Sequence, residues 1–164
     1  MSSTCTLNDC ILHTKTFDEL TTYELYALLR IRSEVFIVEQ NCVYLDPDGN
    51  DQTAIHLWLE HEGRIVATCR ICPQGTKMPD TSIGRVITTE RGRGYGLAIM
   101  QAAIHTIAIR WPECTTVTIE AQADKQGFYE RLGFRPISQP FMMEGLMHLK
   151  MVRTMGDSME SLSI

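Results

Sequence analysis

The chain has 164 residues, of which 44% are hydrophobic and 21% charged, and its formal net charge is -5 at pH 7. This length favours one domain with its own core over two. An acidic chain lacks the basic face of a general nucleic-acid binder, so we expect no nucleic-acid partner. No apolar run approaches the roughly 20 residues of a membrane helix, and residues 1–5 lack a signal-peptide pattern, so we expect a cytoplasmic protein without a membrane partner.

The six cysteines are scattered rather than spaced like the disulfide framework of a small secreted protein. Cys69 and Cys72 have the spacing of a zinc or redox pair, but they fall on an alternating strand, which points the two thiols to opposite faces. No second pair follows, and we expect no metal site. Residues 154–164 show little periodicity, so we expect a single domain over residues 1–153 and a flexible tail behind it.

In chain order, the first third of the sequence predicts a strand, a helix and a loop. Residues 11–16 form a short edge-strand candidate. Thr21 and Glu24 have the spacing of a capping box, and apolar residues recur behind them at helical spacing as far as Phe36. The polar residues 41–53 contain a proline and a glycine and therefore indicate a loop.

The middle of the chain predicts a hairpin, a central strand and a long helix. Alternating apolar residues over 55–59 and 65–71 lie on either side of a Glu-Gly-Arg turn, which is typical of a hairpin. Residues 82–88 are more continuously apolar, as in a central strand. Residues 94–110 carry the clearest helical stripe, and Pro112 ends it.

The last third predicts a strand over 117–121, a short helix over 124–132 that Gly133 closes, and two final strands near 134–142 and 146–152. Strands and helices therefore mix along one chain. This order indicates an α/β or α+β domain built on a mixed sheet.

The candidate chemistry lies between the central strand and the long helix, where glycines alternate at Gly92, Gly94 and Gly96. Glycine lets backbone N–H groups approach an anion closely, and the first N–H groups of a helix are unpaired and carry partial positive charge. Such a turn is suited to a pyrophosphate. Arg91 and Arg93 add positive charge beside it.

Four interpretations of this turn compete. The phosphate loop of NTPases requires a Gly-Lys-Ser/Thr ending, which Tyr95-Gly96-Leu97 does not supply. A dinucleotide turn requires a third glycine where Leu97 stands, and it normally follows the first strand of its domain. The Arg-x-x-Gly-x-Gly turn of GNAT acetyltransferases matches Arg91, Gly94 and Gly96. From the turn alone, a glycine-rich turn without any ligand stays open.

Several segments outside the turn stand in the order that the GNAT superfamily has. They are Phe36-Ile37-Val38-Glu39-Gln40, Ile83-Gly84-Arg85-Val86-Ile87, Ala121-Gln122 and Phe128-Tyr129-Glu130-Arg131-Leu132-Gly133-Phe134. The marks of the ElaA-like group are Arg32-Ser33-Glu34-Val35-Phe36, Asp48-Gly49-x-Asp51 and His56. Over roughly residues 16–151 the chain therefore resembles the GNAT superfamily and, within it, the ElaA-like group.

The resemblance implies the acyl-CoA N-acyltransferase fold, with a mixed and mostly antiparallel sheet of about six or seven strands flanked by about four helices. It implies an enzyme that transfers an acetyl group from acetyl-CoA to a primary amine of a small molecule or peptide, by direct attack in a ternary complex. It is also compatible with a homodimer. The alternative functions are a non-catalytic acyl-CoA-binding or sensing module on the same fold, and a nucleotide-binding protein that uses the glycine turn.

The resemblance also assigns residue roles. Tyr129 is expected to protonate the leaving thiolate, since a phenol with a pKa of about 10 keeps its proton at neutral pH. A backbone N–H of Ile87 or Thr88 is expected to donate to the thioester oxygen. Packing in the core is the alternative role for Tyr129 and Phe128. The expected cofactor-binding residues are Val86, Ile87, Thr88, Arg91, Gly92, Arg93, Gly94, Tyr95, Gly96, Gln122 and Phe128.

The general base and the acceptor site are open among several residues. Glu39, at a helix end that flanks the acceptor site in this fold, is the base candidate. Arg70 and Arg85 lie within strands and need partners if buried, so we expect structural ion pairs there. Further candidates for the general base are Asp46, Asp48, Asp51, His56 and His148. The three aspartates could instead attract a cationic amine, and either histidine could instead be structural. The expected acceptor-site residues are Glu39, Gln40, His56 and His148.

Overall fold

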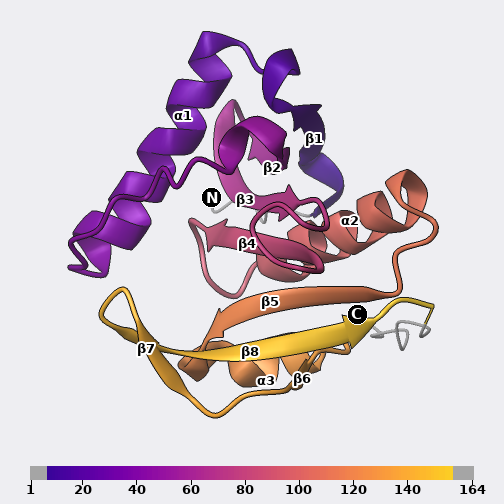
Figure 1. Cartoon of the computed structure of the whole chain (residues 1–164). Coiled ribbons are helices and arrows are strands. Elements are labelled where there is room, and N and C mark those ends of the chain that lie inside the picture. The colour runs from indigo at the N-terminus through magenta and orange to yellow at the C-terminus, as the bar shows by residue number, and fades with distance from the viewer. Residues whose placement is uncertain (1–6, 157–164) are drawn as a thin grey trace.

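The computed structural model describes residues 7–156, which form one sheet of eight strands with helices on both faces (Figure 1). The strands are β1 (Ile11–Thr16), β2 (Ile55–His61), β3 (Arg64–Cys72), β4 (Thr81–Thr88), β5 (Thr116–Gln122), β6 (Arg135–Pro136), β7 (Phe141–Met143) and β8 (Leu146–Thr154). The longer helical segments are α1 (Thr22–Arg32), the π-helical η3 (Ser33–Glu39), α2 (Tyr95–Arg110) and α3 (Gln126–Glu130). Short 3-10 turns are η1 (Leu7–Asp9), η2 (Phe17–Glu19), η4 (Asp51–Thr53) and η5 (Ala123–Lys125).

The sheet diverges in its middle. Its strand order is β1-β2-β3-β4-β5-β8-β6, with β7 paired to β8, and neighbours are antiparallel except for β4 and β5. These two strands are parallel and pair only at Thr81–Val117 and Ser82–Thr118. Beyond these pairs β4 runs on to Thr88 and β5 to Gln122, and the two strands no longer pair with each other. The two halves of the sheet therefore separate, as Figure 1 shows.

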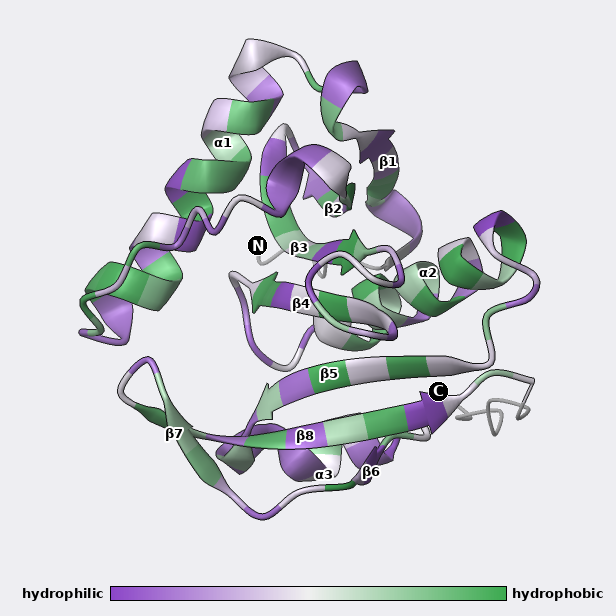
Figure 2. Ribbon diagram, viewed as in Figure 1, coloured by the Kyte–Doolittle hydropathy of each residue, from purple (hydrophilic) through white to green (hydrophobic). Residues whose placement is uncertain are grey.

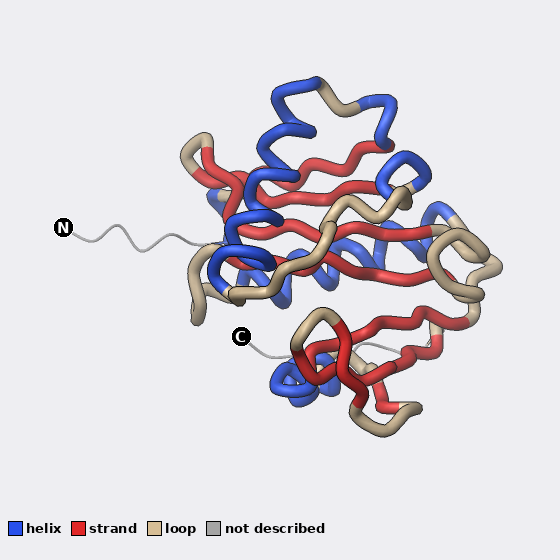
Figure 3. Tube along the Cα trace, turned by 60° about the vertical axis from the view of Figure 1, so that its left-hand side comes forward, coloured by secondary structure: helices blue, strands red, loops and turns tan. Residues whose placement is uncertain are grey.

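The helices lie on opposite sides of the sheet (Figure 3). α2 packs on β2, β3 and β4 and buries Ile99, Met100 and Ile107 completely. Its ribbon is largely hydrophobic in Figure 2. α1 and the segment 40–50 lie across the other face (Figures 1 and 3). Because strand residues alternate between faces, the polar residues between the core positions of β3, β4, β5 and β8 face this second side.

The predicted elements occur in the predicted order, with two differences. The strand predicted near 134–142 is two short strands, β6 and β7, because Pro136 and Pro140 have no N–H for a ladder. This break raises the strand count to eight. The helix predicted as far as Phe36 changes at Ser33 into the π-helical η3, a form often found at functional segments.

The ends of the described chain add two observations. β8 includes Thr154, the first residue of the predicted tail, and residues 157–164 of that tail lie outside the described part. Within residues 7–156, no helix has the length and apolar character to cross a bilayer.

The capping box at the start of α1 is present as predicted, and its removal should be measurable. The Glu24 amide donates to Thr21 Oγ1 at 3.1 Å, and the Thr21 amide donates to the Glu24 carboxylate at 2.9 Å. Thr21→Ala should therefore lower the free energy of unfolding by about 1 kcal/mol in denaturant titrations. Thr22→Ala, one residue further on and also exposed, should change it by less than about 0.5 kcal/mol. Equal effects of the two substitutions would contradict a capping role.

Candidate active site

A pocket of about 1210 Å³ opens where β4 and β5 separate. One wall comes from η3 and the segment behind it, and the opposite wall comes from α3 and the β7–β8 hairpin. The unpaired parts of β4 and β5 and the turn before α2 complete it. The pocket therefore lies where β4 and β5 have backbone groups that no longer pair with each other.

The glycine turn at one end of the pocket has an open backbone. Gly92 and Gly94 have φ angles of 75° and 77°, a left-handed conformation that favours glycine, and Gly94 is the N-cap of α2. A Cβ added at Gly92 would meet no atom within 4 Å. At Gly96 it would lie 3.3 Å from Phe128 Cζ and 3.4 Å from Thr88 Cγ2. The turn is thus accessible at Gly92 and tightly packed at Gly96, and its geometry fits a pyrophosphate at a helix N-terminus.

A bulge in β4 lies beside the separation. Thr68 pairs with Ile87 and Arg70 with Gly84, so two residues of β4 stand opposite one residue of β3. Arg85, in this bulge, has φ of 54°, which is unusual for a side chain other than glycine. A bulge re-aims the backbone that follows, here Val86 to Thr88, which line the pocket.

A largely buried charge cluster lies on the α1 side of the sheet, and its Asp48, Arg70 and Arg85 line the pocket. Its members are Arg32, Arg70, Arg85, Asp46, Asp48 and Asp51. Arg70 donates from both terminal nitrogens to Asp48 at 2.8 Å, and Arg32 donates to Asp46 at 2.7 Å and to Asp51 at 2.6 Å. The Arg85 guanidinium lies 2.8 Å from Asp46 and 5.9 Å from the centroid of the Phe36 ring. Equal numbers of both signs leave the cluster neutral.

The cluster determines the charge of its carboxylates. Burial alone would raise the pKa of Asp48, but its hydrogen bonds and charge interaction with Arg70 outweigh burial and hold the pKa well below its ordinary value. The pKa of Asp51 is lowered for the same reason, with Arg32 as its main partner against burial. These carboxylates are therefore weak proton acceptors.

Tyr129 lies at the α3 side of the pocket among aromatic rings. Its ring meets Phe128 edge-on at 5.0 Å between centroids and Phe134 at 6.1 Å. Burial raises the pKa of the Tyr129 phenol, so the hydroxyl keeps its proton across the neutral and mildly alkaline range. Tyr129 is thus held as a proton donor at the pocket wall.

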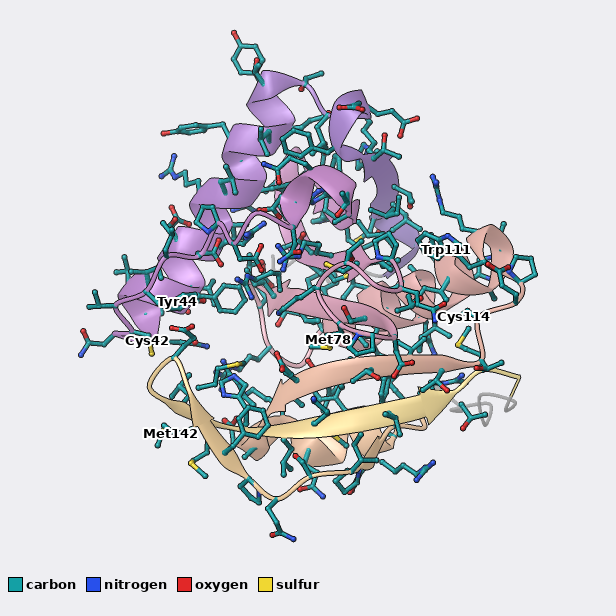
Figure 4. All side chains as sticks on the ribbon, in the orientation of Figure 1. Cys42, Tyr44, Met78, Trp111, Cys114 and Met142 are labelled. Atoms are coloured by element: carbon teal, nitrogen blue, oxygen red, sulfur yellow. The ribbon has the colours of Figure 1, made fainter. Side chains whose placement is uncertain are left out.

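Two contacts join the walls of the pocket. Gln122, the last residue of β5, donates from its amide to the amide oxygen of Gln40 at 3.1 Å. The Cys42 thiol lies 3.5 Å from the position that a Cβ at Gly145 would occupy. Figure 4 shows Cys42 and Tyr44 at the end of the α1–η3 unit that faces the β7–β8 hairpin. The segment after η3 therefore reaches across the pocket to the C-terminal half of the sheet.

His148 lies on β8 beside this junction. It pairs in register with Gln122 of β5 and with Phe141 of β7, whose ring stacks on the imidazole at 6.2 Å between centroids. The ring is 7% exposed and lines the pocket. Its Nδ1 lies 2.8 Å from the carbonyl oxygen of Leu146.

A model of the acetyltransferase (GNAT) domain matches residues 35–155. The chain belongs to the GNAT acetyltransferase family. Protein ElaA of Escherichia coli is 38% identical over 139 residues, which cover 82% of this chain and 90% of that protein. The crystal structure of E. coli ElaA has a TM-score of 0.82 at 36% identity and covers 88% of this chain and 99% of that chain.

A second GNAT-fold structure, an acyl-CoA N-acyltransferase from Pseudomonas aeruginosa, has a TM-score of 0.82 at 34% identity and covers 88% of this chain and 99% of that chain. A third, a GNAT acetyltransferase of Elizabethkingia anophelis with acetyl-CoA bound, shares the fold with a TM-score of 0.62 at 12% identity and covers 90% of this chain and 99% of that chain. The fold expected from the resemblance is therefore confirmed, and the sheet is that of CoA-dependent acyltransferases.

Most residues expected in the GNAT site line the pocket between β4 and β5. They are Glu39, Gln40, Val86, Ile87, Thr88, Arg91, Gly92, Gly94, Tyr95, Gly96, Gln122, Phe128, Tyr129 and His148. Tyr95 belongs to this group chiefly through its backbone, since the residue is 2% exposed and packs in the core. The structure thus brings together segments that lie far apart in the sequence.

Two expected residues do not line this pocket. Arg93 turns back to Glu90, with its Nε 3.1 Å from the carboxylate. His56 is 3% exposed, its Nε2 lies 2.9 Å from the carbonyl oxygen of Asp51, and burial lowers its pKa. His56 is therefore a buried residue bonded to the Asp51 backbone, outside the lining of this pocket.

The structure also places the strand arginines and Cys69. Arg70 and Arg85 form the ion pairs that were expected of buried strand arginines. Cys69 lies in the core, where burial raises its pKa, and residues 7–156 contain no cluster of ligands that could hold a metal ion.

The sequence analysis missed Glu120 and Lys77. Both line the pocket, with 3.8 Å between the Lys77 amine and the Glu120 carboxylate. The alternation of β5 could have found Glu120, because a residue two positions before Gln122 faces the same side. Lys77 lies in the loop before β4, where the sequence has no periodicity that would indicate which way a side chain points.

Proposed function

We propose that this protein is an N-acetyltransferase that transfers the acetyl group of acetyl-CoA to a primary amine of a small molecule or peptide, by direct attack in a ternary complex. The observation that carries the proposal is the pocket itself. It runs from an open glycine turn at the N-terminus of α2 to a polar chamber between η3, β5 and β8. A cytoplasmic location and a homodimer stay predictions from the sequence.

The glycine turn is suited to the pyrophosphate of CoA. Acetyl-CoA supplies the acetyl group as a thioester. Arg91, Lys125 and Arg131 line the pocket and give this end positive charge for phosphates. The backbone of Val86, Ile87 and Thr88 would run beside the pantetheine arm, along the part of β4 that has no parallel partner.

Three groups of the chain would act on the reacting atoms. A backbone N–H of Ile87 or Thr88, re-aimed by the bulge at Arg85, would stabilise negative charge on the acyl oxygen. Tyr129 would donate its proton to the leaving sulfur. Glu39, exposed at the end of η3 on the pocket wall, would attract the cationic form of the amine. Holding amine and thioester together supplies a large part of the rate gain in such reactions.

The cofactor is tested by thermal unfolding with acetyl-CoA, CoA, ATP or NAD added separately. A ligand at about 100 times its Kd stabilises the fold by about 2.7 kcal/mol. We expect stabilisation by acetyl-CoA and CoA alone, followed by thiol release when amines are added. Equal stabilisation by ATP or NAD, or none by CoA, would contradict the proposal.

A matched pair of glycine variants locates the binding site. Gly92 and Gly63 have nearly the same backbone, with φ of 75° and 73°, and neither has an atom within 4 Å of an added Cβ. Alanine at either position therefore carries the same conformational cost, of about 1–2 kcal/mol. Only Gly92→Ala should also weaken the stabilisation by CoA, by about tenfold or more in Kd. Gly63→Ala, in the β2–β3 turn, is the control for strain alone.

A further inference from the structure

The proton acceptor of the proposed reaction can be identified by the hydrogen bonds of the candidate side chains. Asp46, Asp48 and Asp51 are engaged by arginines in the buried cluster, and arginine partners lower the pKa of the last two. The Nε2 of His56 is engaged by the Asp51 carbonyl oxygen, away from the pocket lining. None of these groups offers a free basic atom to the pocket.

Unlike Asp46, Asp51 and His56, His148 lines the pocket. Its Nδ1 lies 2.8 Å from the Leu146 carbonyl oxygen. A carbonyl oxygen can only accept a hydrogen bond, so Nδ1 must carry the proton, and the neutral ring is fixed as the Nδ1–H tautomer. The lone pair is then on Nε2, for which residues 7–156 provide no hydrogen-bond partner.

The residues around His148 keep its imidazole ring in the pocket wall. His148 is 7% exposed, its ring is stacked on Phe141, and its neighbour across the strand pair is Gln122, where β5 ends at the separation from β4. The Gln122 amide is itself bound to Gln40. The imidazole is therefore held by the Leu146 carbonyl oxygen of its own strand and by the Phe141 ring of β7, which limits its freedom to rotate.

We infer that His148 is the general base of this protein, and that Nε2 takes the proton of the attacking amine; the inference rests on the proposed acyl transfer. As the bond between amine nitrogen and acyl carbon forms, the nitrogen loses one proton to Nε2. As the carbon–sulfur bond breaks, the Tyr129 hydroxyl gives its proton to sulfur. The imidazolium then loses its proton to solvent and the phenolate regains one, so the net products are the amide and free CoA.

Other charged groups face the same chamber and define the competing assignments. Glu120 from β5 lies two residues before Gln122, and its carboxylate is 3.8 Å from the Lys77 amine. Burial lowers the pKa of Lys77 and raises that of Tyr44. Glu39 from η3, Glu144 from the β7–β8 turn and Tyr129 from α3 also line the pocket, and Lys150 lies two residues along β8, paired in register with Glu120. Glu39 and Glu144 are exposed to solvent, whereas His148 is enclosed.

The first experiment compares His148→Gln with Glu39→Gln, Glu120→Gln and the control His105→Gln, whose side chain is exposed on α2. Glucosamine, lysine, spermidine and a short peptide serve as amines, and the one with the fastest turnover is used. We expect kcat of His148→Gln to fall by about 10²–10⁴, with the stabilisation by acetyl-CoA unchanged. The decline of kcat toward acidic pH that a general base imposes on the parent should be absent from His148→Gln.

Two further measurements separate a catalytic from a structural role. Imidazole added to His148→Ala should restore part of kcat, which a loss of packing alone would not allow. In the ¹⁵N spectrum of the parent chain, the signal that His148→Gln removes should be that of an Nδ1–H tautomer. The inference would be overturned if the pH profile of His148→Gln were unchanged, or if the ring were the Nε2–H tautomer. It would also be overturned if Glu39→Gln or Glu120→Gln, rather than His148→Gln, lost kcat and the acidic decline. If acetyl-CoA binds and no amine is acetylated, the proposed function fails, and the tautomer measurement still decides the state of His148.

Discussion

Replacing Arg70 with methionine should lower the free energy of unfolding by about 3–5 kcal/mol, because it removes one partner from a buried ion pair and nearly preserves the volume of the side chain. Arg70 is 1% exposed and donates to Asp48 at 2.8 Å and to Asp51 at 3.0 Å. Without it, Asp48 retains the Asn50 amide at 3.1 Å and a single arginine, Arg85, at 3.6 Å. The remaining attraction no longer offsets the cost of burying the carboxylate.

Denaturant titration or thermal unfolding measures this loss, which corresponds to a decrease in Tm on the order of 10 °C. The control is Arg30→Met, which breaks the ion pair between Arg30 and Glu34, whose side chains are 68% and 56% exposed. Such surface pairs contribute about 0–1 kcal/mol. If Arg70→Met lowered the free energy of unfolding no more than Arg30→Met does, the ion pairs of Arg70 would stabilise the fold no more than a surface ion pair.

The pH dependence of unfolding supplies a second measurement on the same variant. The pKa of Asp48 and that of Asp51 are lowered in the folded chain, so the stability they add is present above the ordinary carboxylate range near pH 4 and is lost as pH falls through the folded values. In Arg70→Met the pKa of Asp48 should rise toward or above its ordinary value. Its loss of stability should therefore begin at a higher pH than in the parent, and unfolding midpoints between about pH 2 and 6 would show the difference.

The sequence predicts most of the fold and several residues that line the pocket at the glycine turn, because local rules govern both. The capping box at Thr21, the hairpin and the stripe of α2 depend on neighbouring residues and occur as predicted. The glycine turn is local as well, since the conformations of Gly92 and Gly94 are available to glycine in any context. Tyr129 was found through a motif that places a short helix beside the turn.

The acceptor end could not be predicted in the same way, because it is assembled by contacts between distant segments. β4 stops pairing with β5 after Ser82 and bulges at Arg85, whose guanidinium donates to the carbonyl oxygen of Asp46, 39 residues away. His56 and His148 look alike in the sequence, as single histidines on alternating strands. Each ring bonds to a backbone carbonyl oxygen, His56 to that of Asp51 and His148 to that of Leu146. Only the tertiary structure, which places His148 and not His56 in the pocket lining, distinguishes the two residues.

The largest effect on turnover without loss of stability should come from Tyr129→Phe. The substitution removes one oxygen and keeps the ring between Phe128 and Phe134, so the packing of α3 is retained. Because burial raises the pKa of the phenol, the parent hydroxyl is available as a donor throughout the assay range. Loss of a general acid should lower kcat by about 10²–10⁴, measured as release of free thiol from acetyl-CoA.

Stabilisation by acetyl-CoA should be unchanged in Tyr129→Phe, which separates the chemical step from cofactor binding. Tyr23→Phe is the matched control, because Tyr23 is 88% exposed on α1, and its kcat should equal that of the parent. Combining Tyr129→Phe with His148→Gln tests whether the two residues serve one transfer. Groups that act as a unit give losses that are far from additive, so the double variant should be little slower than the slower single variant. Full turnover in Tyr129→Phe would remove the hydroxyl from the mechanism, and a loss accompanied by weaker acetyl-CoA binding would assign the residue to the cofactor site instead.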